Sequence, residues 1–259
     1  MKVVLLAGGY GTRISEETNI RPKPMVEIGG RPILWHIMRY YASFGHKDFI
    51  VCCGYKSEFI RNYFLNYRAS LSDFTINLCS GEVDFHHTEA EDWSVTVVDT
   101  GLNTMTGGRI KAIQNFIGNE RFCLTYGDGV SNIDLDALLE SHEASGASAT
   151  LTAVAQPGRF GGLSLDTETG KVRSFREKAA IDGSVINGGF FVCEPDVFSL
   201  IDGPDTIWER DPLERLCSSG KLNAYRHAGF WQPMDTLRDK NYLEDLWDRG
   251  EAPWLPRKG

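Results

Sequence analysis

The amino-acid sequence predicts an α/β fold: a Rossmann-like, mostly parallel sheet flanked by helices, followed by a part with added strands and C-terminal helices. In the first half, short apolar runs alternate with segments whose apolar residues recur at helical spacing. This alternation is typical of strands joined by crossover helices, which build a parallel sheet covered on both faces. Ligands of such sheets bind beyond the carboxyl ends of the strands. Two glycine-rich segments, after residue 7 and after residue 126, lie at such ends.

The elements of the first half follow from these patterns in order. Residues 2–7 are an apolar run that ends in glycines, as a buried strand does at the edge of a sheet. Similar runs predict further strands over residues 48–53, 74–78, 95–98 and 122–126. Apolar residues at helical spacing predict helices over residues 33–44, 57–65 and 107–117. Residues 80–94 are polar, and we expect them to form a solvated insertion or a subunit contact.

The second half has shorter expected strands and tight turns. Strands are expected over residues 150–155, 162–165, 171–175 and 185–192, and helices over residues 211–218 and 235–247. The run Asp-Thr-Glu-Thr-Gly at residues 166–170 predicts a hairpin turn. Because no flexible linker separates the halves, residues 1–259 are expected to form one domain whose role changes near residue 148.

Composition and charge exclude several function classes. Hydrophobic residues make up 42% and charged residues 24% of the 259-residue chain, as in soluble globular proteins. The net charge of -8 argues against nucleic-acid binding, which usually needs a basic surface. No apolar run approaches the roughly 20 residues that cross a bilayer, and residues 3–7 are too short for a signal peptide. We therefore expect a cytoplasmic protein without nucleic-acid or membrane partners, whose six cysteines are reduced core residues.

The strongest motif is the glycine-rich loop after the first strand, Leu-Ala-Gly-Gly-Tyr-Gly-Thr-Arg at residues 6–13. Glycines let backbone N–H groups approach an anion, and the guanidinium of Arg13 offers donors suited to phosphate. Lys23 lies between two prolines, which stiffen the backbone beneath a flexible cation. The spacing fits neither a Walker motif nor a dinucleotide-binding fingerprint. The loop and Lys23 predict a phosphate site, with a plain turn and a surface lysine as the alternative.

These two motifs, Leu-Ala-Gly-Gly-x-Gly-Thr-Arg and Pro-Lys-Pro-Met, resemble those of the sugar-nucleotide pyrophosphorylases, a family of nucleotidyltransferases. The segments most similar to its glucose-1-phosphate cytidylyltransferase branch are residues 23–38, 106–109, 125–130 and 229–238. The resemblance covers nearly the whole chain. It implies that CTP and glucose 1-phosphate react, with Mg²⁺ as cofactor, to give CDP-glucose and pyrophosphate. It also implies a homo-oligomer and a product used for surface polysaccharide such as O-antigen.

Asp128 and Asp235 are the expected metal ligands. Asp128 lies between two glycines just after the strand over residues 122–126, where a carboxylate can hold Mg²⁺ beside phosphates. The alternative is an aspartate in a plain reverse turn. Asp235 matches a second metal-binding aspartate of the family, but it could instead cap the helix expected over residues 235–247.

The resemblance also implies which residues bind and transform the nucleotide. The implied catalytic residues are Arg13, Lys23, Asp128 and Asp235. The implied nucleotide-binding residues are Leu6, Ala7, Gly8, Gly9, Gly11, Thr12, Arg13, Lys23, Thr104, Gly108 and Arg109. Arg109 only donates hydrogen bonds, so it could serve cytosine O2, while a carbonyl of the glycine loop accepts from N4. Phosphate binding and the capping of a surface are the alternatives for Arg109.

The sugar-phosphate site is expected in the second half. Glu177 and Lys178 match the pair with which the family grips the sugar hydroxyls and the 1-phosphate, although Ala179 stands where the family usually has proline. Gly161, Asn187 and Gly188 complete the implied set, and both glycine turns could be structural instead. Residues 1–148 are therefore the expected nucleotide-binding part, and residues 149–259 the sugar-phosphate-binding and C-terminal part.

The expected reaction is a direct in-line attack by the sugar-phosphate oxygen on the α-phosphorus. Lys23 would face the α-phosphate, Arg13 the leaving pyrophosphate and Lys178 the sugar phosphate. Three alternatives stay open: the same chemistry with dTTP, UTP, GTP or another hexose 1-phosphate, a non-catalytic nucleotide-sugar-binding regulator, and a dinucleotide-dependent oxidoreductase. The four intact catalytic residues argue against the regulator, and the missing fingerprint argues against the oxidoreductase.

Overall fold

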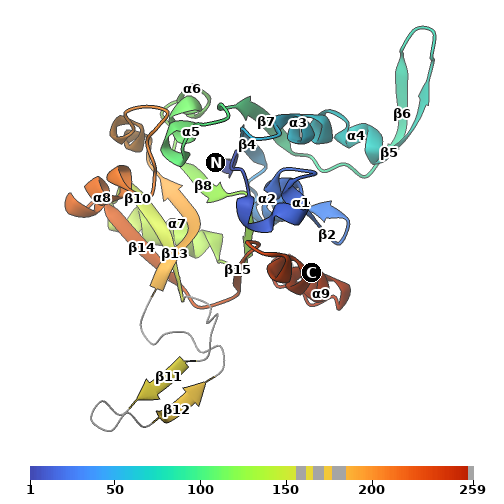
Figure 1. The fold of residues 1–259 in the computed structure, drawn as a ribbon. Helices are drawn as coiled ribbons and strands as arrows, with labels where there is room; N and C mark the ends of the chain where they lie inside the picture. Colours follow the sequence, from blue (N-terminus) through green and yellow to red (C-terminus); the bar gives the residue numbers. More distant parts are fainter. Residues whose placement is uncertain (156–161, 166–171, 177–184, 256–259) are drawn as a thin grey trace.

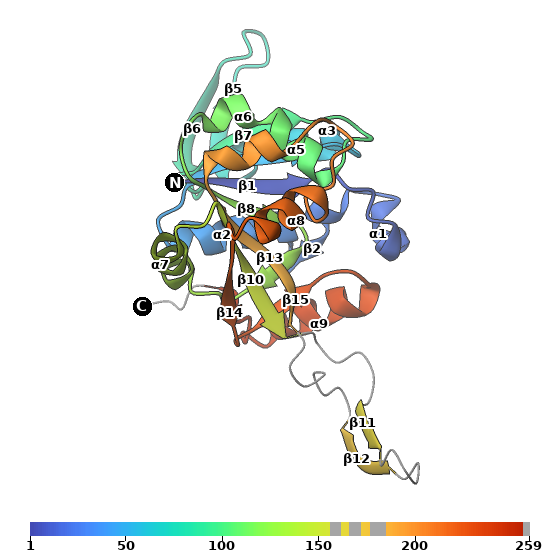
Figure 2. The same ribbon diagram turned by 90° about the vertical axis from the view of Figure 1, so that its left-hand side faces the viewer.

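The computed structural model describes residues 1–155, 162–165, 172–176 and 185–255. Within these residues, the largest sheet has seven strands in the order β14-β10-β13-β8-β1-β4-β7. Strands β8, β1, β4 and β7 run parallel, as do β10 and β14. Only β13 in this sheet is antiparallel to both of its neighbours. The mostly parallel α/β fold is thus confirmed, and helices cover both faces of the sheet (Figures 1 and 2).

The sheet is built from β1 (Lys2–Ala7), β4 (Asp48–Cys53), β7 (Ser94–Asp99), β8 (Phe122–Tyr126), β10 (Ala149–Ala155), β13 (Val185–Cys193) and β14 (Leu222–His227). Antiparallel pairs outside it are β2 (Glu27–Ile28) with β3 (Arg31–Pro32), β5 (Ser72–Ile76) with β6 (Val83–Thr88), β9 (Gly129–Ser131) with β15 (Trp231–Pro233), and β11 (Gly162–Leu165) with β12 (Val172–Arg176).

The α-helices are α1 (Ser15–Thr18), α2 (Ile33–Ser43), α3 (Ser57–Leu65), α4 (Tyr67–Ser70), α5 (Thr106–Ala112), α6 (Gln114–Ile117), α7 (Leu135–Ser145), α8 (Asp211–Ser218) and α9 (Leu237–Asp248). Short 3-10 turns are η1 (Thr12–Ile14), η2 (Lys23–Met25) and η3 (Pro195–Leu200). None of the helices in the described part is long and apolar enough to span a membrane.

Strand β1 explains why both faces of the sheet carry helices. Val3 and Leu5 belong to one apolar cluster, together with residues of α2 and α9. Val4 and Leu6 belong to a second cluster, together with residues of α5 and α8. Burial on both faces gives a strand that reads as a continuous apolar run. This is why the sequence predicted it correctly.

Residues 80–94, expected to form a solvated insertion or a subunit contact, contain a strand that was not predicted. Residues Val83–Thr88 form β6, which pairs with β5 in a hairpin that projects from the body of the molecule (Figure 1). The apolar run at residues 74–78 predicted β5 with its bounds displaced by two residues, whereas β6 shows no alternation of buried and exposed residues and was not predicted. The helix expected over residues 107–117 is also interrupted, and Ile113 separates α5 from α6. The turn expected at residues 166–170 lies outside the described residues.

Candidate active site

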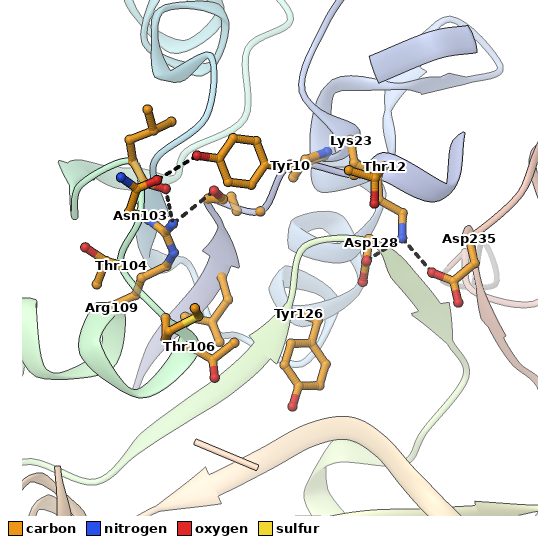
Figure 3. A pocket seen from close by; sticks show the side chains of 18 residues that line it. Tyr10, Thr12, Lys23, Asn103, Thr104, Thr106, Arg109, Tyr126, Asp128 and Asp235 are labelled. Carbon is orange, nitrogen blue, oxygen red and sulfur yellow. Dashed lines mark hydrogen bonds and ion pairs between the residues drawn. The ribbon is translucent and has the colours of Figure 1, made fainter. Parts of the chain in front are cut away.

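A pocket of about 520 Å³ opens at the carboxyl ends of β1 and β8, where ligands of parallel sheets bind. Its wall includes the glycine loop at residues 6–12, Lys23, the segment at residues 102–106, and Arg109. Tyr126, Asp128 and Asp235 complete the polar lining. Figure 3 shows Thr104 and Arg109 on one side of the pocket and Lys23 with the two aspartates on the other.

The glycine loop is held close to its surroundings. A Cβ at Gly8 would lie 2.2 Å from the Arg109 guanidinium, so only glycine fits there. Gly11 has a φ of +65°, a left-handed conformation that glycine adopts without strain, and its carbonyl accepts a hydrogen bond of 3.1 Å from the Thr18 hydroxyl. Thr12 follows in the turn η1. Arg13 belongs to the same turn, but its side chain lies outside the described part.

Lys23 connects the two predicted metal ligands. Its Nζ atom lies 2.6 Å from Oδ2 of Asp128 and 2.8 Å from Oδ1 of Asp235, and only 8% of the residue is exposed. Burial alone would lower the pKa of Lys23, but the two carboxylates outweigh it and raise the pKa above its usual value. The lysine is therefore charged at neutral pH and bridges both aspartates.

A short strand pair brings the two aspartates together. Strand β9 follows Asp128 directly and pairs with β15, which ends just before Met234. The backbone N–H of Met234 donates a 2.8 Å hydrogen bond to the Asp128 carbonyl. The alternative that Asp235 caps the following helix is wrong, because Thr236 caps α9 in a reciprocal capping box with Asp239. The Asp235 carboxylate instead faces the pocket, beside Lys23.

The donor set fits a magnesium ion. Both carboxylates reach a single nitrogen atom, so one cation could contact both. Mg²⁺ prefers oxygen ligands and usually takes one or two carboxylates, with water and phosphate oxygens completing its shell. No group of three or more histidine, cysteine, aspartate or glutamate side chains suited to a metal occurs among the described residues.

Arg109 lies deep in the opposite wall, with 5% of the residue exposed. Its Nη1 donates to the Thr100 hydroxyl and to the carbonyls of Cys53 and Gly101 at 2.7–3.0 Å. Its Nη2 donates to the carbonyls of Gly8 and Leu102 at 3.0 and 3.3 Å. The alternative that Arg109 caps a surface is therefore wrong. Its guanidinium holds the glycine loop against neighbouring segments, and a contact with cytosine O2 stays a prediction.

Most of the other expected nucleotide-binding residues line the pocket, but Gly108 does not. Leu6, Ala7, Gly9 and Thr104 line the pocket. Gly108 does not line it, because this glycine packs against the loop before α8, where a Cβ would lie 2.4 Å from the Pro204 carbonyl oxygen.

The sequence missed several lining residues, among them Tyr10, Asn103, Thr106 and Tyr126. Tyr10 and Tyr126 lie inside motifs that the sequence analysis recognised, so their place in these motifs could have predicted that they line the pocket. Asn103 joins the site through a 2.8 Å hydrogen bond from the Tyr10 hydroxyl, a contact that the sequence does not indicate.

The expected sugar-phosphate site is described only in part. Gly161, Glu177 and Lys178 lie outside the described residues. Asn187 and Gly188 belong to β13 and do not line the pocket. The Gly188 carbonyl accepts a 2.7 Å hydrogen bond from the indole of Trp231, and the Asn187 side chain accepts one from Gly189.

Comparison with known proteins agrees with this geometry. Residues 2–236 match the nucleotidyl transferase family, and the chain belongs to that family and is a nucleotidyltransferase. It is 56% identical to glucose-1-phosphate cytidylyltransferase of Salmonella typhi, with 98% of each chain covered. It is 44% identical to a probable glucose-1-phosphate cytidylyltransferase of Bacillus subtilis, with 98% of this chain and 99% of the relative covered.

The fold is shared with solved structures of low sequence identity. The crystal structure of HddC from Yersinia pseudotuberculosis matches with a TM-score of 0.71 at 22% identity, covering 95% of this chain and 99% of that one. A likeness at this identity extends to the fold alone.

Proposed function

We propose that this nucleotidyltransferase transfers the cytidylyl group of CTP to glucose 1-phosphate, giving CDP-glucose and pyrophosphate. The observation that carries the proposal is the cluster of Lys23, Asp128 and Asp235 beside the glycine loop. It combines donors for phosphates with carboxylates for a metal. The 56% identity to a glucose-1-phosphate cytidylyltransferase over nearly the whole chain supports the choice of both substrates.

In the proposed reaction, an oxygen of the sugar phosphate forms a bond to the α-phosphorus while the bond from the α-phosphorus to the pyrophosphate oxygen breaks. No covalent enzyme intermediate is needed, because the attacking phosphate is already anionic at neutral pH. The main difficulty is to bring two anions together, so the site must supply positive charge and alignment. Mg²⁺ held by Asp128 and Asp235 would supply charge that stabilises the phosphates as bonding changes.

Lys23 supplies a second, movable charge. Its ammonium bridges the carboxylates that a metal would take, and its four-carbon stem is flexible. When CTP brings an α-phosphate into the pocket, Lys23 can turn to that phosphate and leave the carboxylates to the metal. Gly8, Gly9 and Gly11 offer backbone donors to the triphosphate. Arg13 would bind the leaving pyrophosphate, and Glu177 and Lys178 the sugar phosphate, as their motifs imply.

Base recognition is proposed for the opposite wall, where Thr104 lines the pocket and Arg109 holds the glycine loop. Cytosine presents an amino donor at N4 and acceptors at N3 and O2. Backbone carbonyls of the glycine loop would accept from N4. Binding of the base beside Arg109 would place its O2 near the guanidinium.

We also propose that the protein is a cytoplasmic homo-oligomer. All six cysteines are free thiols, as expected in a reducing compartment, although Cys79 and Cys217 are exposed rather than in the core as the sequence suggested. The β5–β6 hairpin exposes Phe74, Ile76 and Leu78, which is typical of a surface that contacts another subunit. Light scattering after size exclusion would give the mass, and a monomer would contradict this assembly.

The catalytic proposal is tested by following pyrophosphate release from glucose 1-phosphate and Mg²⁺ with each of five nucleoside triphosphates in separate reactions. Release with CTP, abolished by EDTA, is expected. Release only with dTTP, UTP or GTP would retain the chemistry and overturn the base assignment. No release with any of the five would overturn the substrate assignment.

A further inference from the structure

Glu209 joins two walls of the pocket although it does not line the pocket itself. It lies between η3 and α8. Its Oε2 atom accepts a 2.6 Å hydrogen bond from the Thr106 hydroxyl, and its Oε1 atom accepts one from the Tyr126 hydroxyl. Thr106 and Tyr126 both line the pocket, and they come from α5 and β8. One carboxylate therefore ties together two elements that approach the site from different sides.

The contact with Thr106 is part of a close fit between α5 and the segment at residues 204–209. The Met105 N–H donates to the Pro204 carbonyl at 2.8 Å, and the Gly108 N–H donates to the Thr206 carbonyl at 3.2 Å. The Thr106 hydroxyl also accepts a 2.9 Å hydrogen bond from the Trp208 N–H. The segment that includes Glu209 thus sets the position of the pocket wall at residues 102–106.

The contact with Tyr126 fixes the end of β8. The Tyr126 ring packs so closely on Gly189 that a Cβ there would lie 2.4 Å from the ring. The ring also meets Phe191 edge-on, with centroids 6.2 Å apart. At its other end, the Tyr126 hydroxyl donates a hydrogen bond to the Glu209 carboxylate. Tyr126 is therefore held at both ends, two residues before Asp128.

We propose that Glu209 is a positioning residue for nucleotidyl transfer, because it fixes the pocket wall at residues 102–106 relative to the strand end that carries Asp128. The inference rests on the proposed function. Correct spacing of these walls aligns the base side of the nucleotide with the metal ligands and Lys23. A displacement of about 1 Å in such an arrangement can cost roughly 100-fold in rate.

The chemistry of the two hydroxyls explains why a carboxylate is suited to this place. An ionised glutamate only accepts hydrogen bonds and offers two oxygens, so it can satisfy both donors at once. In Glu209→Gln, the amide offers one oxygen and one NH₂ group, and one hydroxyl must reorient to accept. In Glu209→Ala, both hydroxyls lose this partner.

The test compares kcat and both KM values for the unaltered protein, Glu209→Ala, Glu209→Gln and Tyr126→Phe. Each is assayed with the nucleoside triphosphate that the unaltered protein turns over. We expect Glu209→Ala to lower kcat/KM for the nucleotide by about tenfold, since hydrogen bonds to charged groups contribute on this scale. The kcat/KM of Glu209→Gln should lie between those of Glu209→Ala and the unaltered protein. Asp205→Ala, which removes an exposed carboxylate of the same loop, is the matched control and should match the unaltered protein.

The double variant Glu209→Ala/Tyr126→Phe distinguishes positioning from general destabilisation. If Glu209 acts through Tyr126, the fold loss of kcat/KM in the double variant is clearly smaller than the product of the fold losses in the two single variants. Multiplicative losses would overturn the inference. So would a Glu209→Ala protein within twofold of normal kcat and nucleotide KM, even if its free energy of unfolding fell. If Glu209→Ala does not fold, Glu209→Gln decides by the same criteria. Failure of the unaltered protein to use CTP would overturn the proposed function instead.

Discussion

Two buried cations, Lys23 and Arg109, face each other across the pocket, and their partners differ in kind. Lys23 contacts two carboxylates on side chains that can also bind a metal. Arg109 contacts four backbone carbonyls and one hydroxyl. A ligand can take the partners of Lys23 without disturbing the backbone. It could take those of Arg109 only by opening the pocket wall.

The comparison teaches that burial and charge alone do not identify a catalytic cation. The Lys23 side of the pocket can rearrange when substrates bind, so it is suited to chemistry. The Arg109 side is held by the protein's own backbone, so it is suited to shaping the site. Substitution of Lys23 should therefore lower mainly the rate of the reaction. Substitution of Arg109 should lower mainly the stability of the protein and its affinity for the nucleotide.

The largest effect is expected for Lys23→Ala. Loss of the cation nearest the α-phosphate should lower kcat by about 10²–10³-fold, as loss of one donor to a developing oxyanion does. Pyrophosphate release at saturating substrates measures this effect, with circular dichroism to confirm the fold. Lys240→Ala is the control, because Lys240 is a half-buried lysine that pairs with Glu17 away from the pocket. If kcat of Lys23→Ala were within threefold of that of the unaltered protein, Lys23 would not act in the reaction and would not differ from Arg109 in this respect.

Arg109→Lys should act mainly on stability and nucleotide affinity. An ammonium has three donors on a flexible stem and cannot replace the planar fork that reaches five oxygens. Buried carbonyls left without donors should reduce the free energy of unfolding by about 2–3 kcal/mol, and KM for CTP should rise. Urea denaturation measures the first change, with the half-exposed Arg215→Lys as control. Normal stability together with a large fall in kcat would place Arg109 in the chemistry instead.

His36 is a third buried basic residue, and unlike Lys23 and Arg109 it can be buried without its charge. This fully buried histidine has neutral partners, the Ile28 carbonyl at 2.8 Å and the Trp254 indole at 3.2 Å. Burial, to which the Arg31 charge adds, lowers the pKa of His36 to about 4 although two backbone hydrogen bonds oppose the shift.

Because the unfolded chain takes up this proton near pH 6.5 and the folded protein does not, stability is present above pH 6.5 and declines as the pH falls toward 4. The free energy of unfolding should drop by about 2 kcal/mol between pH 7 and pH 5 from this residue. Urea denaturation of the unaltered protein and of His36→Gln at both pH values isolates the contribution. If the free energy of unfolding changed equally between pH 7 and pH 5 in the two proteins, His36 would not be the source of the pH dependence.

A smaller effect concerns metal affinity without nucleotide. In Lys23→Met, Asp128 and Asp235 lose their bridging ammonium, so Mg²⁺ no longer has to displace it. We expect Mg²⁺ to bind about tenfold more tightly to this variant than to the unaltered protein, the scale of a partly buried ion pair. Calorimetric titration measures both affinities. Equal or weaker binding to the variant would show that Lys23 and the metal do not compete.

The sequence predicted the parts of the molecule in which a local pattern determines structure. The run at residues 2–7 is apolar because both faces of its strand are covered. Of the glycines after it, Gly8 is required by close packing against Arg109, and Gly11 by its left-handed backbone conformation. Strand β5 was predicted from its apolar run, with its bounds displaced by two residues, but β6 escaped prediction because its side chains are mostly exposed on both faces. For such strands, hydrophobic alternation carries no signal.

Roles that depend on tertiary contacts were less accessible. Thr236 rather than Asp235 caps α9, and neighbouring residues of similar capping ability cannot be separated from sequence alone. The hydrogen bonds by which Arg109 holds the glycine loop were not predicted, because they reach segments up to 101 residues away. The link from Glu209 to Tyr126 spans 83 residues, and no motif indicates it.

The assignment of the pocket to cytidylyl transfer is tested most directly by competition among nucleotides. The unaltered protein is given glucose 1-phosphate, Mg²⁺ and equal concentrations of ATP, GTP, UTP, dTTP and CTP, and the sugar nucleotides formed are identified by mass. CDP-glucose is the expected product. A predominance of dTDP-glucose, UDP-glucose or another sugar nucleotide, or the absence of any, would contradict it.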